Sequence, residues 1–343
     1  MSSMSTPAAR AVRRLPVAAV ALVATLLLAA CGGGATTSTG SGTSAAPAGG
    51  AFPVKVEHKY GTTEVKAEPK RVVTLGLSDQ DVVLALGTKP VGAVDWFKET
   101  PYGKWPWTKS LWGDTPPEVV GERDEYNLEK IAGLKPDLIL AQYSGMKQEQ
   151  YDTLSKIAPV VAQPTGFEDY QAPWQDMARL AGKALGKSDQ VQKLIKDIDD
   201  EFAAAKTAHP EFTGKTAVVA DAYQPGTYSL FSPNDPKMLF LSQLGFVVPD
   251  KLKEAVGKEN VVDFSYERFD VVDVDRLVWL TTDPASAEQI KGEALYKGLK
   301  VVQDKHDLFV PYDEPPIGAA MSFNTVLSIP YALDQMLPLL AAK

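Results

Sequence analysis

Apolar residues of the chain fall into two alternating patterns from residue 53 onward. Short continuous apolar runs are typical of strands buried on both faces, and they alternate with segments that have helical spacing. The predicted strands lie at 71–76, 91–94, 136–141, 160–162, 216–220, 274–281 and 308–311. The predicted helices lie at 79–86, 127–133, 147–157, 170–185, 235–244, 285–292 and 325–340. This alternation favours mainly parallel sheets covered by helices.

A longer helical stripe interrupts the alternation. Residues 188–208 repeat apolar side chains at helical spacing, with Ser188 as the expected N-cap and His209-Pro210 at the end. At 1.5 Å per residue this helix is about 30 Å long, enough to bridge two domains. The segment 127–140 also has a weak counterpart at 265–279. We therefore expect an α/β fold with two lobes joined by one long linker helix.

The N-terminal segment has the pattern of an export signal. Arg10, Arg13 and Arg14 precede an apolar stretch at 15–30, which is shorter than the roughly 20 residues of a membrane-spanning helix. The stretch ends in Leu-Ala-Ala-Cys31, which is similar to a bacterial lipobox, and Cys31 is the only cysteine of the chain. We expect Cys31 to be acylated; a plain secretory signal with an incidental cysteine is the alternative.

The residues after Cys31 complete the predicted organisation. Residues 32–50 are rich in Gly, Ser, Thr and Ala and carry no charge, as in a flexible tether. We expect a protein held on the outer face of the cytoplasmic membrane by its lipid anchor only. The predicted parts are a signal peptide (1–30), acylated cysteine and tether (31–52), N-terminal lobe (53–187), linker helix (188–210) and C-terminal lobe (211–343).

Composition excludes several classes of protein. The formal charge is −8, and without the three arginines of the first thirty residues the rest sums to −11, which disfavours binding to nucleic acid. One cysteine excludes an intrachain disulfide framework. The three histidines, His58, His209 and His306, are widely spaced and are interpreted as surface residues, so we expect no metal site.

Sequence motifs for catalysis do not match. The tripeptide Gly214-Lys215-Thr216 lacks the earlier glycine of a phosphate-binding loop and precedes a strand instead of following one. The chain contains neither a Gly-x-Ser-x-Gly nor a His-Glu-x-x-His motif. We therefore expect no enzyme activity and no cofactor.

A tryptophan-rich segment follows the second predicted strand. It places four tryptophans within seventeen residues, at Trp96, Trp105, Trp107 and Trp112. The carboxyl edge of a parallel sheet is where ligands bind in open α/β folds, and tryptophan offers a large contact area with a polar tip. We interpret the four as ligand contacts; a hydrophobic cluster packed under its own loop is the alternative.

Other polar and aromatic residues share this predicted edge. Tyr143 and Ser144 follow the strand at 136–141, and Tyr223 and Tyr228 flank a Gln-Pro-Gly-Thr turn just beyond another strand. Each tyrosine alone is as compatible with a structural role as with binding. Arg123 lies among acidic residues, where a surface ion pair of little energetic value is the alternative to a ligand contact.

The order and spacing of these segments resemble one family. The lipobox, the tether, Arg-Val-Val-Thr-Leu, Asn-Leu-Glu-x-Ile-x-x-Leu-Lys-Pro-Asp-Leu-Ile, Phe-Ser-Pro-Asn and Ser-Tyr-Glu-Arg-Phe are similar to those of class III substrate-binding lipoproteins of ABC importers. The iron-siderophore branch, which includes the ferrichrome-binding proteins, is the most similar, over about residues 53–343. The resemblance implies two α/β lobes joined by a long helix, with a shallow cleft between them.

The resemblance also implies roles for individual residues. Arg123 stands where the branch has an arginine that holds hydroxamate oxygens, and Tyr143 fits a tyrosine after the third strand. Glu129 and Glu267 match a pair, one per lobe, that docks onto permease arginines; the alternative is that each only favours the start of a helix. The C-lobe tryptophan of the family is missing here, because Gly257-Lys-Glu-Asn-Val stands in its place. Tyr223, Tyr228, Arg268 and Phe323 are our candidates for that half of the site.

These observations predict a monomeric receptor that captures a ferric siderophore and passes it to an ABC permease. An acidic protein with few arginines at the site suits neutral or cationic hydroxamate or mixed-ligand complexes better than a tricatecholate. A haem or cobalamin receptor on the same fold and a surface adaptor without a small ligand are the alternatives. A free-metal receptor would need clustered ligands that the sequence lacks, and an extracytoplasmic hydrolase is a more distant alternative.

Overall fold

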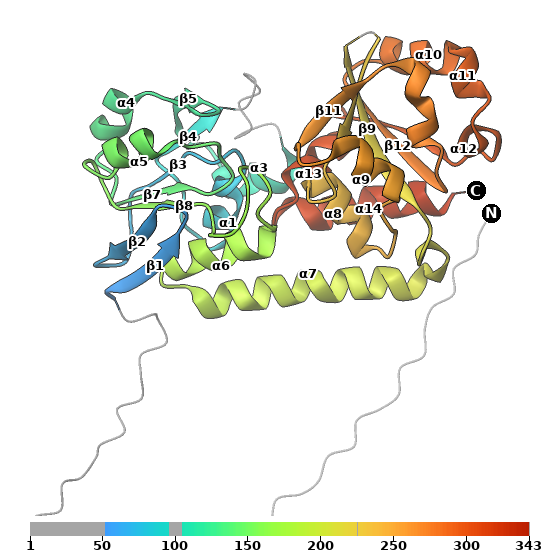
Figure 1. The fold of residues 1–343 in the computed structure, drawn as a ribbon. Helices are drawn as coiled ribbons and strands as arrows, with labels where there is room; N and C mark the ends of the chain where they lie inside the picture. The colour runs from blue at the N-terminus through green and yellow to red at the C-terminus, as the bar shows by residue number, and fades with distance from the viewer. Residues whose placement is uncertain (1–51, 96–104, 225, 343) are drawn as a thin grey trace, which may run out of the picture. The chain divides into compact units, whose positions relative to one another are not determined.

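The computed structural model describes residues 52–95, 105–224 and 226–342. The chain divides into two units, Met1–Ala46 and Pro47–Lys343, and every helix and strand described here belongs to the second. Within that unit, two large sheets are each flanked by helices (Figure 1). The predicted α/β fold with two lobes and one long helix is therefore confirmed.

The first lobe contains a six-stranded sheet in the order β6-β5-β4-β3-β7-β8. Neighbouring strands are parallel, apart from the antiparallel pair β5 and β6. The carboxyl ends of the central strands lie together because Thr74 pairs with Leu140. The strands are β3 (Val72–Thr74), β4 (Gly92–Asp95), β5 (Glu118–Glu122), β6 (Glu125–Tyr126), β7 (Leu138–Ala141) and β8 (Val160–Ala162).

Short helices and a hairpin complete the first lobe (Figure 1). Asn127 caps α4 by accepting a hydrogen bond from the backbone N–H of Lys130 at 3.0 Å. The helices are α1 (Asp79–Ala85), α3 (Pro106–Trp112), α4 (Leu128–Gly133), α5 (Gln148–Leu154) and α6 (Trp174–Ala184). The antiparallel hairpin consists of β1 (Val54–His58) and β2 (Gly61–Val65).

The long helix α7 (Ser188–Ala208) has 21 residues, as the apolar stripe predicted. It packs against α6 of the first lobe and against α14 and the 3-10 helix η1 (Pro210–Phe212) of the second. The expected N-cap was wrong, because Ser188 is the first helical residue and Lys187 precedes it without a side-chain cap. The buried stripe consists of Val191, Ile195, Ile198, Phe202 and Ala205.

The second lobe contains a five-stranded sheet in the order β11-β10-β9-β12-β13. Strands β9, β12 and β13 are parallel, whereas β9, β10 and β11 form an antiparallel meander. The expectation of a mainly parallel sheet holds for one half of this sheet. The strands are β9 (Ala217–Gln224), β10 (Thr227–Phe231), β11 (Val261–Phe264), β12 (Arg276–Thr281) and β13 (Asp307–Pro311).

After η1, the described residues of the second lobe form eight helical segments. The last of them, α14, contains Pro338. They are α8 (Pro236–Gln243), α9 (Asp250–Val256), the 3-10 helix η2 (Tyr266–Val272), α10 (Pro284–Gly292), α11 (Ala294–Lys297), α12 (Lys300–Gln303), α13 (Ile317–Phe323) and α14 (Ser328–Ala341). Among the residues that the structure describes, no helix has both the length and the apolar character to cross a membrane.

One histidine contradicts its predicted surface position. His58 is only 1% exposed, and its Nε2 lies 2.9 Å from Thr63 Oγ1. Desolvation by burial lowers the pKa of His58 to about 4. His58 shares the inward face of β1 with Val56, so the alternation of that strand indicates that His58 is buried.

Candidate functional site

A buried carboxylate organises the carboxyl edge of the first sheet. Asp79, at the start of α1, accepts backbone N–H bonds from Gly76 at 3.1 Å, Gln142 at 2.8 Å and Tyr143 at 3.1 Å. Burial raises the pKa of Asp79 to about 6, and the three donors oppose that shift. The carboxylate therefore fixes the loop that follows β7, which carries the predicted residues Tyr143 and Ser144.

Tyr143 belongs to an aromatic and charged group that we call the edge cluster: Arg123, Asp124, Tyr143 and Tyr170. The ring of Tyr143 is 6% exposed and packs edge-on against Tyr170, with centroids 5.3 Å apart. The guanidinium carbon of Arg123 lies 5.8 Å from the centroid of the Tyr170 ring, within cation–π range. The structure thus brings the predicted Arg123 and Tyr143 to the same edge, where both contact Tyr170.

Backbone geometry presents Arg123 at this edge. Arg123 and Asp124 form the two-residue turn between β5 and β6, and Arg123 has a φ of +49°, as a tight hairpin turn requires. Asp124 accepts a hydrogen bond from the backbone N–H of Gly145 at 2.8 Å and another from the hydroxyl of Tyr170. The Arg123 side chain is exposed, so its guanidinium is accessible to a ligand.

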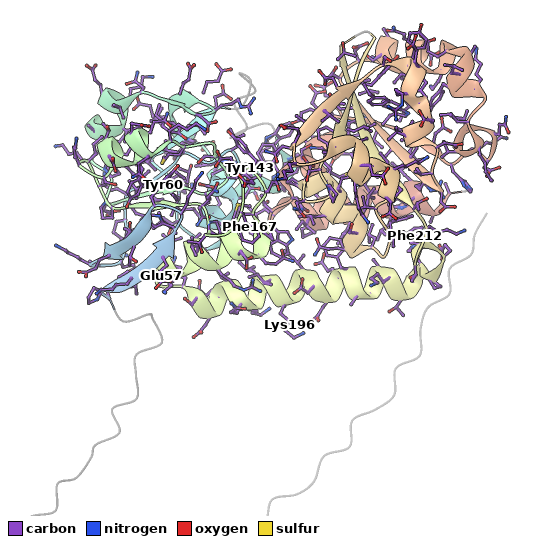
Figure 2. All side chains as sticks on the ribbon, viewed as in Figure 1. Glu57, Tyr60, Tyr143, Phe167, Lys196 and Phe212 are labelled. Atoms are coloured by element: carbon purple, nitrogen blue, oxygen red, sulfur yellow. The ribbon has the colours of Figure 1, made fainter. Side chains whose placement is uncertain are left out.

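The second lobe contributes charges to the same place. Burial raises the pKa of Tyr143 well above its ordinary value, and Asp235, Tyr170 and Tyr312 raise it further. Asp235 caps α8 and lies 2.9 Å from the ammonium of Lys237. Figure 2 shows Tyr143 at the side of the first lobe nearest the second. Residues of both lobes therefore act electrostatically on Tyr143.

Ser144 is buried and makes its hydrogen bonds within the turn after β7. It is 2% exposed, its hydroxyl donates to the carbonyl of Ala141 at 3.0 Å, and it accepts from the backbone N–H of Met146 at 3.4 Å. These bonds shape the turn after β7. The ligand role of Ser144 stays a prediction.

The tryptophan segment lies partly between the lobes. Trp96 falls outside the described residues. Trp105 and Trp107 stack with centroids 5.3 Å apart, and both pack against Phe323 of α13, at 5.9 and 6.2 Å. Trp107 also contacts Tyr331 of α14 at 5.5 Å. We call these four side chains the junction cluster: Trp105, Trp107, Phe323 and Tyr331.

The described tryptophans of this segment differ in how deeply they are buried. Trp105 is 2% exposed and Phe323 is 1% exposed, whereas Trp107 is half-buried. Trp112 is 1% exposed and packs with Leu84 and Ala93 inside the first lobe. Trp112 is therefore part of the protein interior, and Trp105 and Phe323 meet in a contact between the lobes. Ligand contact by these tryptophans stays a prediction.

The predicted second-lobe residues are dispersed. Tyr223 and Tyr228 lie inside β9 and β10, so their expected position beyond a strand was wrong. The antiparallel hairpin is the reason, because Gln224 of β9 already pairs with Thr227 of β10. Tyr228 is 2% exposed and packs against Phe264, Phe269 and Trp279. Arg268, in η2, is exposed and pairs with Asp270 at 3.1 Å.

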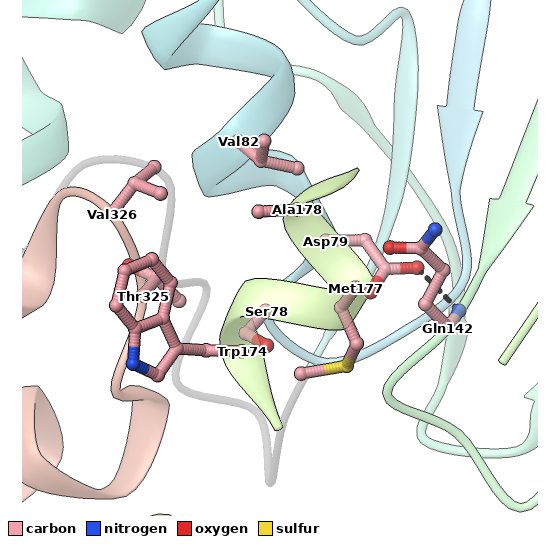
Figure 3. Close-up of a pocket in the computed structure, with 9 residues that line it drawn as sticks. All are labelled: Ser78, Asp79, Val82, Gln142, Trp174, Met177, Ala178, Thr325 and Val326. Atoms are coloured by element: carbon pink, nitrogen blue, oxygen red, sulfur yellow. Dashed lines mark hydrogen bonds between the residues drawn. The ribbon is translucent and has the colours of Figure 1, made fainter. Parts of the chain in front are cut away.

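A small cavity lies at the contact between the lobes (Figure 3). Its volume is about 20 Å³, enough for one water molecule but far too small for a siderophore. A hollow of about 320 Å³ opens along residues 313–316, directly after Tyr312. The nine residues that line the small cavity are Ser78, Asp79, Val82, Gln142, Trp174, Met177, Ala178, Thr325 and Val326.

Sequence reasoning missed several residues of this region. Asp79, Asp124 and Tyr170 gave no signal in the sequence, because their roles depend on contacts between distant segments. Asp235 did give one, since Asp-Pro before an apolar stripe predicts a helix start. The described residues contain no cluster of three or more His, Cys, Asp or Glu side chains that could hold a metal ion.

Comparison with known proteins gives consistent matches. Residues 72–310 match the family model described as periplasmic binding protein. The probable siderophore-binding lipoprotein YfiY of Bacillus subtilis is 33% identical over 72% of this chain and 77% of its own length. The Fe(3+)-citrate-binding protein YfmC of the same organism is 31% identical over 73% of this chain and 75% of its own length.

Solved structures match the fold. The crystal structure of PiaA from Streptococcus pneumoniae in complex with ferrichrome superimposes with a TM-score of 0.71 at 30% sequence identity. The match covers 84% of this chain and 97% of PiaA.

Proposed function

Because the chain belongs to the periplasmic binding protein family, we propose that it is a lipid-anchored extracytoplasmic receptor that binds a ferric siderophore and delivers it to an ABC permease. The observation that carries the proposal is the edge cluster, in which an exposed arginine and the ring of Tyr143 both lie against Tyr170. Relatives named for siderophore and ferric citrate binding support the ligand class.

The proposed ligand is a hydroxamate or mixed-ligand complex. Arg123 contributes a positive charge to the edge cluster, and Asp124 in the same turn and Asp235 of the second lobe, which acts on Tyr143, contribute negative charge. Such a mixed field repels a tricatecholate complex, which carries about three negative charges, more than a neutral complex. The guanidinium of Arg123 can donate charge-assisted hydrogen bonds to the oxygens that coordinate the iron.

Tryptophan fluorescence tests this proposal on residues 47–343. Ferrioxamine, ferrichrome, a ferric catecholate, ferric citrate, haem and cobalamin would be titrated in turn. We expect saturable quenching by a ferric hydroxamate at submicromolar concentration, with weaker binding of the other compounds. Much tighter binding of the catecholate would refute the charge argument. If haem or cobalamin bound most tightly, the protein would be a receptor for that compound and not for a siderophore.

Arg123→Ala tests the site itself. We expect an affinity loss of about 10- to 100-fold, as for a hydrogen bond to a charged group, and an unchanged melting temperature. Arg179→Ala is the matched control, because Arg179 is an exposed arginine whose recorded ion pair is with Asp176 on its own helix. Equal affinity of the Arg123 variant and wild type would remove Arg123 from the site.

The junction cluster favours a second candidate function. Trp105 and Trp107 pack against Phe323, and a site occupied by its own tryptophans is what a surface adaptor without a small ligand would have. The same titration separates the two candidates. Failure of the whole panel to bind to a folded protein would favour the adaptor.

Delivery to the permease is proposed to depend on Glu129 and Glu267. Both side chains are exposed, in the first turn of α4 and of η2 respectively. We expect the double change Glu129→Lys and Glu267→Lys to abolish siderophore-dependent iron uptake by cells while ligand affinity is unchanged. Glu149→Lys is the control, since Glu149 is equally exposed in the first turn of α5.

The lipid anchor is proposed to be at Cys31. We expect Cys31→Ser to move the protein from the membrane fraction to the soluble fraction without changing ligand affinity. A variant that stays with the membrane would show that another segment anchors the chain.

A further inference from the structure

Asp81 joins segments that are far apart in the chain. Its side chain is fully buried on α1. The same oxygen, Oδ2, accepts a hydrogen bond from the indole N–H of Trp107 at 3.1 Å and another from the hydroxyl of Thr325 at 2.5 Å. Trp107 belongs to the first lobe and Thr325 to the second, so one carboxylate oxygen connects α1, α3 and the segment before α14. We call these two hydrogen bonds the Asp81 link.

Thr325 is itself fixed at the start of α14. Its hydroxyl oxygen accepts from the backbone N–H of Ser328 at 3.1 Å, and its own backbone N–H donates to Ser328 Oγ at 2.9 Å. Ser328 Oγ in turn donates to the carbonyl of Ala320 in α13 at 2.9 Å. The carboxylate of Asp81 thus lies at the N-terminal end of a 14-residue helix, where the helix dipole favours negative charge.

Trp107 connects the same carboxylate to the junction cluster. Its ring stacks on Trp105 and contacts Phe323 and Tyr331, while its indole N–H is held by Asp81. The ring can slide or tilt between aromatic neighbours at little cost, because aromatic pairs tolerate several geometries. A directed hydrogen bond removes that freedom, so the Asp81 link fixes the orientation of the ring.

Burying a carboxylate at this position is energetically unfavourable for the fold. Asp81 Oδ1 is buried and has no hydrogen-bond partner among the described residues, and burying a charge with one unsatisfied oxygen is unfavourable. An apolar side chain would pack here without that cost. The benefit that a carboxylate adds is geometric, since it accepts two donors from two lobes at one point.

We propose that Asp81 is a positioning residue that holds the junction cluster between the lobes, and that it thereby sets how firmly the receptor retains its ligand. The statement about ligand retention rests on the proposed function. The statement about the junction does not, because it concerns contacts within the protein alone. Asp81 itself does not touch the ligand in this proposal.

Hydrogen exchange of the full chain in detergent micelles tests the junction. Removing the acceptor with Asp81→Ala should accelerate exchange of the Trp107 indole N–H and of the backbone N–H groups at the start of α14 by about 10- to 100-fold. Asp81→Asn should restore slow exchange, because its amide oxygen can still accept both donors. Asp221→Asn is the matched control, since Asp221 is a largely buried carboxylate inside the second lobe.

Thr325→Val keeps Asp81 and removes one donor, so it provides a test even if Asp81→Ala fails to fold. We expect Thr325→Val to accelerate exchange at both Trp107 and α14, and the double variant with Asp81→Ala to add little. Unchanged exchange at Trp107 in folded Thr325→Val, or full additivity in the double variant, would overturn the proposal, because independent structural roles add.

Ligand dissociation tests the second statement. The dissociation rate of whichever panel compound binds should rise about tenfold or more in Asp81→Ala and Thr325→Val, and return toward wild type in Asp81→Asn. An unchanged dissociation rate with accelerated exchange would overturn the role in retention. If wild-type protein binds none of the panel, the proposed function fails, and the exchange experiment still decides whether Asp81 holds the junction.

Discussion

The two sheets of this protein present their carboxyl edges in different ways. In the first sheet, the parallel strands β3, β4 and β7 are neighbours, and the segments after β3 and β7 meet at Asp79. In the second sheet, β9 continues into an antiparallel hairpin with β10. The predicted tyrosines there lie within strands, and Tyr228 belongs to the core. A residue that follows a strand therefore lies at the carboxyl edge only when the chain leaves the sheet after that strand. It does not lie there when the chain turns back as a neighbouring antiparallel strand.

The largest expected effect tests the core assignment of Tyr228. Tyr228→Ala should lower the free energy of unfolding by about 3–5 kcal/mol, because it empties a site packed by Phe264, Phe269 and Trp279. Tyr228→Phe should change it by less than about 1 kcal/mol, since the buried hydroxyl has no hydrogen-bond partner among the described residues. Urea denaturation measures both. A stable Tyr228→Ala variant with weakened ligand binding would instead place Tyr228 in the site.

Two buried carboxylates, one from each lobe, sharpen the comparison. Asp79 accepts three backbone N–H bonds, whereas Asp221 Oδ1 has no partner among the described residues. Asp79→Asn should cost about 2–3 kcal/mol, because its NH₂ group would face backbone donors. Asp221→Asn should be neutral or stabilising at pH 8. Thermal unfolding of both variants would check this, and similar losses in both would contradict it.

The pH dependence of stability follows from the same groups. Burial raises the pKa of Asp79 to about 6, of Asp221 to about 6 and of Asp81 to about 7. A pKa raised by folding gives stability that is full below the ordinary value of 3.8 and is lost as pH rises through the folded value. These three groups should therefore reduce stability between about pH 4 and pH 7. Denaturation at several pH values measures the effect. The free energy of unfolding of Asp221→Asn should fall less over this pH range than that of the wild type.

Gly76→Ala probes the loop that the first edge depends on. A methyl group at Gly76 would overlap the carboxylate of Asp79, so we expect a loss of about 1–3 kcal/mol and weaker ligand binding through displacement of Tyr143. Gly133→Ala in α4 is the control, because nothing lies within 4 Å of the position that its Cβ would take, and alanine favours helix. Circular dichroism melts compare the two. Equal stability of the Gly76 variant and wild type would show that Asp79 can move.

The smallest effect is expected at Arg268. Its ion pair with Asp270 is solvent-exposed, and such pairs contribute about 0–1 kcal/mol. Arg268→Ala should leave stability nearly unchanged and weaken ligand binding less than Arg123→Ala does, because Arg123 lies at the edge cluster. Titration of the two variants side by side measures the contrast. A larger loss for the Arg268 variant would move the centre of the site to the second lobe.

The sequence by itself determined the alternation of strands and helices, the long linker helix and the family. Apolar runs such as 136–141 and the apolar stripe of α7 are local patterns. They distinguish strands from helices because apolar residues repeat at different intervals in the two. The roles of Arg123 and Tyr143 were implied by the family resemblance, and the structure brings the two residues to one edge because β5 and β7 belong to the same sheet. The predictions of Ser188 as a cap and His58 as a surface residue were wrong. Ser188 is already inside the helix, whereas the alternation of β1 does place His58 on the inward face with Val56.

Only the tertiary structure decided which residues meet. Trp105 and Phe323 are more than two hundred positions apart, yet they pack together, because the contact between the lobes brings α3 onto α13. Asp81 is an ordinary helix residue in the sequence, and it becomes a link only when Trp107 and Thr325 converge on one of its oxygens. Such contacts have no sequence signature, because their energy comes from burial and from the direction of hydrogen bonds between distant segments.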